Sequence, residues 1–140
     1  MRPIWIIDDD RSIRWVFDKA LKRENLPHQI FDTAESALRA LERETPGAIL
    51  TDIRMPGMDG LELMNRIKVQ NPRLPVIIMT AYSDLDSAVS AFQGGAFEYL
   101  PKPFDVNHAL ELIHRALEEG GREEGAGQEG HELLLRRLVP

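Results

Sequence analysis

The chain contains no cysteine among its 140 residues, which excludes a disulfide framework and a thiolate metal site. No apolar run approaches the roughly 20 residues of a membrane span, and the beginning lacks the pattern of a secretory signal peptide. The cytoplasm is therefore the expected location. Basic residues are the minority, and a formal net charge of -6 argues against direct binding of a nucleic acid backbone by this segment. We expect neither a membrane nor a nucleic acid as a direct partner.

The sequence instead has a regular alternation of short apolar runs with longer stretches of helical periodicity, which is typical of repeated βα units. This pattern predicts a doubly wound α/β fold with a five-stranded parallel sheet in the flavodoxin-like order 2-1-3-4-5. The strands are predicted at residues 4–7, 28–31, 48–51, 76–79 and 97–100.

The intervening segments predict helices with recognisable ends. Ser12 and Thr33 are the predicted N-caps of the first two helices, Ser83 or Asp84 caps the fourth, and Gly120-Gly121 ends the last. By length the chain is one domain, predicted at residues 1–119. Residues 120–140 are rich in Gly and Glu and predict a linker, or a tail foreign to the natural protein.

Five polar residues follow predicted strands at their carboxyl ends. Asp8 and Asp9 follow the first strand, Asp52 the third, Thr80 the fourth and Lys102 the fifth. The carboxyl ends of parallel strands share one rim of a sheet, where ligands bind. We therefore expect these side chains to lie close together.

Each residue alone has an ordinary explanation, because an acid after a strand is usually a helix cap or a turn former. Together they have a chemical meaning. Clustered carboxylates raise one another's pKa unless a cation joins them, and oxygen ligands favour Mg²⁺. A hydroxyl and an ammonium beside the metal suit an oxyanion, so the set indicates phosphoryl chemistry.

Four motifs carry a resemblance to a known family. Asp8-Asp9, the stretch 52–60, Met79-Thr-Ala81 and Lys102-Pro-Phe104 resemble the receiver domains of two-component response regulators, over roughly residues 3–119. More narrowly, residues 12–16, 51–60 and 74–105 resemble the NtrC family of nitrogen regulators, which activate transcription with the sigma-54 polymerase.

The resemblance implies a role for each acid. Asp52 would be the phosphoacceptor and receive the phosphoryl group of a histidine kinase. Asp9 and Asp52 would hold Mg²⁺ directly, with the Arg54 backbone carbonyl as a third protein ligand and Asp8 acting through water. Asp10 lies where the family varies and is ranked lower.

It also implies a switch. Lys102 would pair with a phosphoryl oxygen, and the Lys102-Pro103 bond is cis in many relatives. Thr80 would hydrogen-bond the phosphoryl group and Tyr99 would then rotate inward. Arg54 and Tyr82 occupy positions that tune hydrolysis in relatives.

The implied partners are a histidine kinase and the ATPase and DNA-binding output domains of a longer protein. A homodimer would form through the face built by the fourth helix, fifth strand and fifth helix. Residues bordering that face are Val89, Phe92, Tyr99 and Ala109.

The chain is therefore expected to be a signalling switch rather than a turnover enzyme, with self-phosphorylation from small donors and self-dephosphorylation. Four alternatives stay open. A phosphohydrolase with an Asp nucleophile needs a second acid two residues on, where Arg54 stands. A flavodoxin-like cofactor protein needs a hydroxyl- or glycine-rich loop after the first strand, where acids stand. The others are a receiver acting by protein contact alone and a receiver of a different output class.

Overall fold

The computed structural model describes residues 2–81 and 84–125, with some side chains of the fourth helix and of the end of the fifth left aside. All five strands are parallel, in the order β2-β1-β3-β4-β5, which confirms the predicted fold class. The elements are β1 (Ile4–Ile7), α1 (Arg11–Arg23), β2 (His28–Phe31), α2 (Ala34–Leu41), β3 (Ala48–Asp52), α3 (Gly60–Gln70), β4 (Val76–Ala81), α4 (Leu85–Gln93), β5 (Glu98–Lys102) and α5 (Val106–Gly125).

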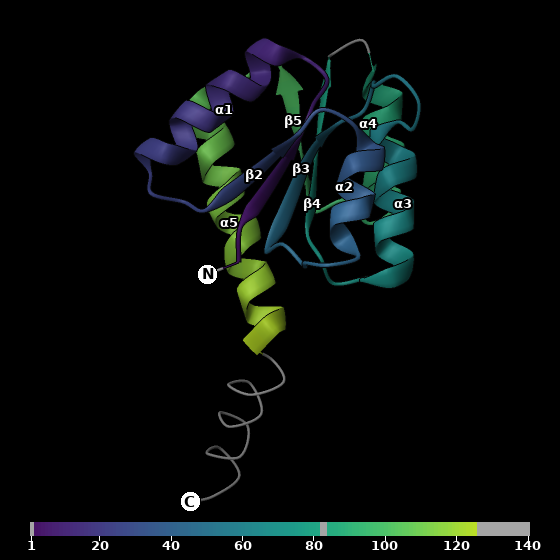
Figure 1. Ribbon diagram of the computed structural model, residues 1–140. Helices are drawn as coiled ribbons and strands as arrows, with labels where there is room; N and C mark the ends of the chain where they lie inside the picture. Colours follow the sequence, from purple (N-terminus) through teal and green to yellow (C-terminus); the bar gives the residue numbers. More distant parts are fainter. Residues whose placement is uncertain (1, 82–83, 126–140) are drawn as a thin grey trace, which may run out of the picture.

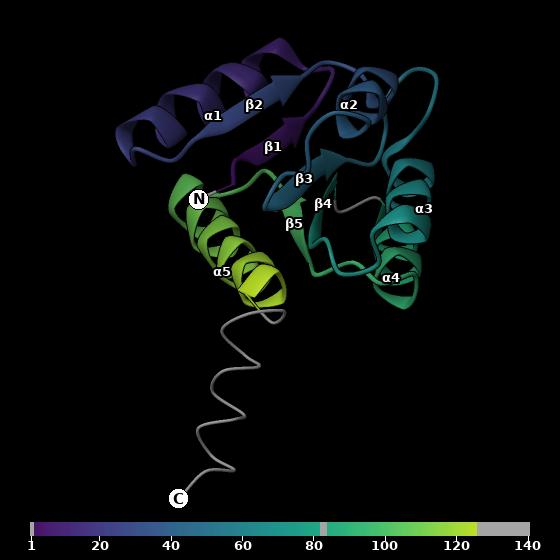
Figure 2. The same cartoon turned by 60° about the horizontal axis from the view of Figure 1, so that its bottom comes forward.

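The sheet is covered on both faces. Helices α1 and α5 lie on one side, and α2, α3 and α4 on the other (Figures 1 and 2). Alternate residues of a strand point to opposite faces. Ile4 and Ile6 of β1 accordingly pack in the cluster under α1 and α5, whereas Trp5 and Ile7 pack under α2 and α3. Apolar side chains fill both faces, so polar chemistry is left to the ends of the sheet.

Three strands run further than predicted. Asp52 is the last residue of β3, Thr80 lies inside β4, and Lys102 is the last residue of β5. Thr80 and Lys102 continue the parallel pairing, with Thr80 opposite Pro101 and Ala81 opposite Lys102. Asp52, Thr80 and Lys102 are therefore held by the sheet itself, whereas Asp8 and Asp9 lie in the loop after β1.

The first helix begins earlier than predicted. Its N-cap is Asp10, whose side chain accepts a hydrogen bond from the Ser12 N–H at 2.8 Å, and Arg11 is the first helical residue. The prediction of Ser12 as the cap was wrong, because an Asp two residues earlier satisfies the same orphan amides. Thr33 caps α2 as predicted.

The last helix does not end at Gly120-Gly121, as predicted; it continues to Gly125. Glycine disfavours a helix by only about 1 kcal/mol relative to alanine, and here close packing requires it. A Cβ on Gly120 would lie 2.1 Å from the Gly47 carbonyl oxygen. Gly120 is thus a contact point between α5 and the start of β3. The proposed tail at 126–140 lies outside the described residues.

The N-cap of α4 is Asp84, but its side chain makes no capping hydrogen bond. The alternative cap, Ser83, and the residue expected to tune hydrolysis, Tyr82, lie outside the described residues. Within the described part of the chain, no helix combines the length and the apolar character that crossing a membrane requires.

Candidate phosphoryl-transfer site

The predicted acid cluster forms at the carboxyl end of the sheet. Asp8, Asp9 and Asp52 each offer a carboxylate oxygen, and these three oxygens lie within 4.8 Å of one another. Asp8 is fully buried and Asp52 is 8% exposed, whereas Asp9 is exposed. The strand order explains the meeting, because β1 and β3 are neighbours and both end here.

Lys102 reaches this cluster from β5. Its Nζ lies 3.2 Å from Asp8 Oδ2 and 3.4 Å from Asp52 Oδ1. Burial opposes the lysine charge, but the attraction of the two carboxylates exceeds that effect and raises the pKa of Lys102. The cis peptide bond at Lys102-Pro103 is present, as the resemblance implied. Lys102 is therefore a protonated cation at this rim.

The acids are not fully compensated by that lysine. Burial, followed by repulsion from Asp8, raises the pKa of Asp52 to about 6, although Lys102 opposes the rise. Burial also raises the pKa of Asp8 against the Asp10 N–H and Lys102, which favour the ionised form. Ionisation of either carboxylate in the folded, metal-free protein therefore lowers the free energy of unfolding.

The donor set fits a divalent cation. Three carboxylates beside one ammonium leave two negative charges uncompensated, and Mg²⁺ would neutralise them. Carboxylate oxygens are also the ligands that hard cations prefer. The cluster can therefore hold a metal ion. Because Asp9 is exposed, a cation can reach the cluster from solvent.

Two neighbours fix the buried Asp8. The Asp10 N–H donates to Asp8 Oδ1 at 2.8 Å, and Arg14 Nη1 donates to the Asp8 carbonyl oxygen at 2.8 Å. Arg14 was not predicted as a site residue. The sequence did contain a signal for this contact. Helical side chains lean towards the N-terminus of their helix, so an Arg one turn into a helix can reach back to the acidic loop that precedes it.

Thr80 lies near the end of β4 and Tyr99 near the start of the neighbouring strand β5. Thr80 is 1% exposed, and its hydroxyl donates to the Ala81 carbonyl at 3.2 Å. Tyr99 is half-buried and meets Phe92 of α4 edge-on, with ring centroids 5.5 Å apart. Tyr99 therefore contacts α4 through Phe92.

Arg54 joins the loops above the site. Its guanidinium makes two hydrogen bonds to the Asp84 carboxylate, at 2.9 and 2.6 Å, and so connects the segment after β3 to the start of α4. These bonds lower the pKa of Asp84. Asp84 is occupied by this pair, which explains why it does not cap α4.

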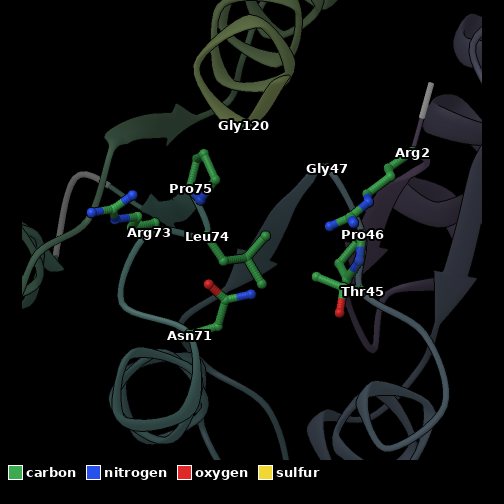
Figure 3. Close-up of a pocket in the computed structure, with 9 residues that line it drawn as sticks. All are labelled: Arg2, Thr45, Pro46, Gly47, Asn71, Arg73, Leu74, Pro75 and Gly120. Atoms are coloured by element: carbon green, nitrogen blue, oxygen red, sulfur yellow. The ribbon is translucent and has the colours of Figure 1, made fainter. Parts of the chain in front are cut away.

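A hollow of about 160 Å³ lies at the other end of the sheet (Figure 3). It is bordered by the starts of β3 and β4 and by Gly120 of α5, and its lining contains no acid. Lining residues are Arg2, Thr45, Pro46, Gly47, Asn71, Arg73, Leu74, Pro75 and Gly120. The hollow therefore has none of the carboxylates that gather at the opposite end of the sheet.

Comparisons with known proteins agree with this geometry. The response regulator receiver domain model matches residues 4–114. The DNA-binding transcriptional regulator NtrC of Proteus hauseri is 57% identical over 114 residues, which are 81% of this chain and 24% of that protein. The chain thus spans about a quarter of the length of the curated relatives it matches.

Two solution structures of the receiver domain of nitrogen regulatory protein C are also similar. The apo form has a TM-score of 0.77 at 55% identity and covers 84% of this chain and 94% of that chain. The BeF3-activated form has a TM-score of 0.74 at 54% identity and covers 84% and 97%.

Proposed function

Because the chain belongs to the response regulator receiver domain family, whose members are phosphorylation-activated switches, we propose that Asp52 is its phosphoacceptor. The observation that carries the proposal is the position of Asp52, which lies between two other carboxylates and the Lys102 ammonium. An acid held between a metal-binding set and a cation can attack phosphorus while the charge on the phosphoryl oxygens is neutralised.

The transfer itself needs few groups. A carboxylate oxygen of Asp52 attacks the phosphorus of a phospho-imidazole, the P–O bond forms, and the P–N bond breaks with its electron pair leaving on the imidazole. Lys102 is placed to move from Asp8 to a phosphoryl oxygen. Asp9, Asp52 and the Arg54 carbonyl would hold Mg²⁺, with Asp8 acting through water. The bound ion would supply charge neutralisation for the acceptor and the phosphoryl oxygens.

The longer protein to which such a domain belongs is also a proposal. The NtrC relatives are DNA-binding transcriptional regulators, which supports a histidine kinase as donor and a sigma-54-type ATPase with a DNA-binding domain as output. We place the receiver at residues 1–119 and its dimer contact on the face around Phe92 and Tyr99. Cytoplasmic location follows from these partners.

Intact mass tests the proposal directly. Incubation with acetyl phosphate and Mg²⁺ should add one phosphoryl group, and EDTA should prevent the addition. The phosphorylated form should decay slowly to the original mass. Continuous turnover of the donor with no phosphorylated protein accumulating would instead favour the phosphohydrolase alternative.

Replacing Asp9 with asparagine should weaken Mg²⁺ binding by about tenfold or more. Loss of a residue that only orients a metal ligand already lowers metal affinity by about tenfold, and Asp9 is proposed as a direct ligand. Fluorescence can report the titration, because Trp5 is buried against Phe31 and lies in β1, the strand that ends just before Asp8. Asp10→Asn is the matched control, because asparagine keeps the helix cap. If Asp9→Asn and Asp10→Asn had equal Mg²⁺ midpoints, Asp9 would not be a ligand of the metal.

Replacing Thr80 with alanine should leave Asp52 phosphorylatable but reduce the phosphorylated population that has the switched conformation. A hydrogen bond to a charged group contributes about 1.5–3 kcal/mol, so its loss should lower the ratio of active to inactive conformers by about tenfold or more. NMR shifts around Tyr99 measure this ratio. Thr45→Ala, at the opposite end of the sheet, is the control. Parental shifts in phosphorylated Thr80→Ala would exclude a coupling role.

A further inference from the structure

The β3–α3 loop, residues 53–59, carries the Arg54 carbonyl proposed as a metal ligand. Its two ends are tied together, because the Gly60 N–H donates to the Ile53 carbonyl at 2.8 Å. Side chains near its start, Ile53 and Met55, are buried with those of α2 and α3. The far part of the loop has a different support, which comes from a distant point in the sequence.

That support is Glu35 in the first turn of α2. The Met58 N–H donates to Glu35 Oε1 at 2.9 Å across 23 residues of sequence. The neighbouring Gly57 has a φ of +77°, and a Cβ there would lie 3.2 and 3.3 Å from the two carboxylate oxygens. The left-handed conformation of Gly57 therefore brings the loop backbone against the Glu35 carboxylate, which accepts the hydrogen bond from the Met58 N–H.

Glu35 is itself firmly placed. Thr33 caps α2 by accepting the Ser36 N–H at 3.1 Å, and Ala34 and Ala37 on either side of Glu35 are fully buried. Helices α2 and α3 lie side by side on one face of the sheet (Figures 1 and 2). A charged acceptor on this rigid base makes a stronger hydrogen bond than a neutral one.

We propose that Glu35 is a positioning residue for the metal site: it holds the β3–α3 loop in the shape that presents the Arg54 carbonyl to the cation. This role rests on the proposed function. Glu35 touches neither the cation nor the phosphoryl group, and it acts through the Met58 amide. Loss of its side chain would let the loop sample other shapes, so binding of the cation would first have to order it.

Two variants separate positioning from simple charge. Glu35→Gln removes the negative charge but keeps a side-chain oxygen that can accept the Met58 amide, whereas Glu35→Ala removes both. Both substitutes are good helix formers, and thermal unfolding in EDTA checks that each variant folds. Glu42→Ala, at the exposed C-cap of the same helix, controls for loss of a distant acid.

The expected result is a rise of about tenfold in the Mg²⁺ dissociation constant for Glu35→Ala, as for other residues that orient metal ligands. Glu42→Ala should stay near the parent, and Glu35→Gln, whose neutral oxygen makes a weaker hydrogen bond, should lie between the parent and Glu35→Ala. In the metal-free protein, hydrogen exchange of the Met58 amide should speed up more in Glu35→Ala than in Glu35→Gln. This second readout requires neither metal nor phosphorylation.

Equal weakening in Glu35→Ala and Glu35→Gln would attribute the effect to charge and overturn the positioning role. Parental Mg²⁺ affinity in Glu35→Ala would also overturn it. Failure of the parent protein to bind Mg²⁺ would overturn the proposed function first, and the positioning role with it, so the two failures are distinguishable.

Discussion

Substitution of Asp52 by asparagine should reduce phosphate uptake from acetyl phosphate and Mg²⁺ to below detection. The amide keeps the shape of the carboxylate but lacks its nucleophilic anionic oxygen. It also removes one of the three carboxylates of the acid cluster, so binding of the cation should weaken as well. Intact mass after incubation would show the unmodified protein, while the parent shows one added phosphoryl group.

Asp59→Asn is the matched control for this loss. Asp59 is the exposed N-cap of α3, where its side chain accepts the Glu62 N–H at 2.8 Å, and asparagine caps as well as aspartate. Its phosphorylation should match that of the parent. Phosphate uptake by Asp52→Asn at the parental rate would place the acceptor elsewhere.

The same Asp52→Asn substitution should make the metal-free protein more stable at neutral pH. The pKa of Asp52 is raised from 3.8 to about 6 in the folded protein, so the folded state binds its proton more tightly than the unfolded chain does. The free energy of unfolding is therefore lowered by this group above pH 6 and recovers as the pH falls from 6 towards 4. A shift of this size corresponds to a gain of about 1–3 kcal/mol on neutralisation.

Urea unfolding in EDTA at pH 7.5 and pH 5 measures this gain. The difference in free energy of unfolding between Asp52→Asn and the parent should be largest at pH 7.5 and smaller at pH 5. Saturating Mg²⁺ should narrow it at neutral pH, because the cation stabilises the folded parent. Asp59→Asn should stay within about 0.5 kcal/mol of the parent, as exposed substitutions do. If the difference in free energy of unfolding did not change with pH, the raised pKa of Asp52 would be wrong.

The sheet and its rim were predictable because parallel topology turns sequence position into spatial position. An acid or lysine placed directly after a buried apolar run must emerge at the carboxyl edge. Asp8, Asp9, Asp52 and Lys102 all obey this rule, and the structure brings them together. Helix ends were less predictable, since Asp10 and Ser12 compete for one cap and only the backbone geometry decides between them.

Contacts between distant loops were not predictable from spacing. Arg54 contacts Asp84 across 30 residues and Glu35 contacts Met58 across 23. Neither contact could be predicted, because no periodic pattern in the sequence relates the two residues of either pair. The glycine at position 120 is a further case. In sequence it indicates a helix end, but in the structure it permits the close approach to Gly47.

That approach joins the far end of α5 to the sheet. The helix begins shortly after Lys102, has 20 residues and runs along one face of the sheet (Figure 1), and its Gly120 lies against the Gly47 carbonyl before β3. At 1.5 Å per residue, about 21 Å of helix separate Val106 from Gly120, and Ala109, Leu112, Ile113 and Ala116 within this stretch are buried in the core. Position 120 therefore cannot accept a side chain unless α5 moves away from β3, and such a movement would disturb a helix that is close-packed along its length up to the end that starts beside Lys102.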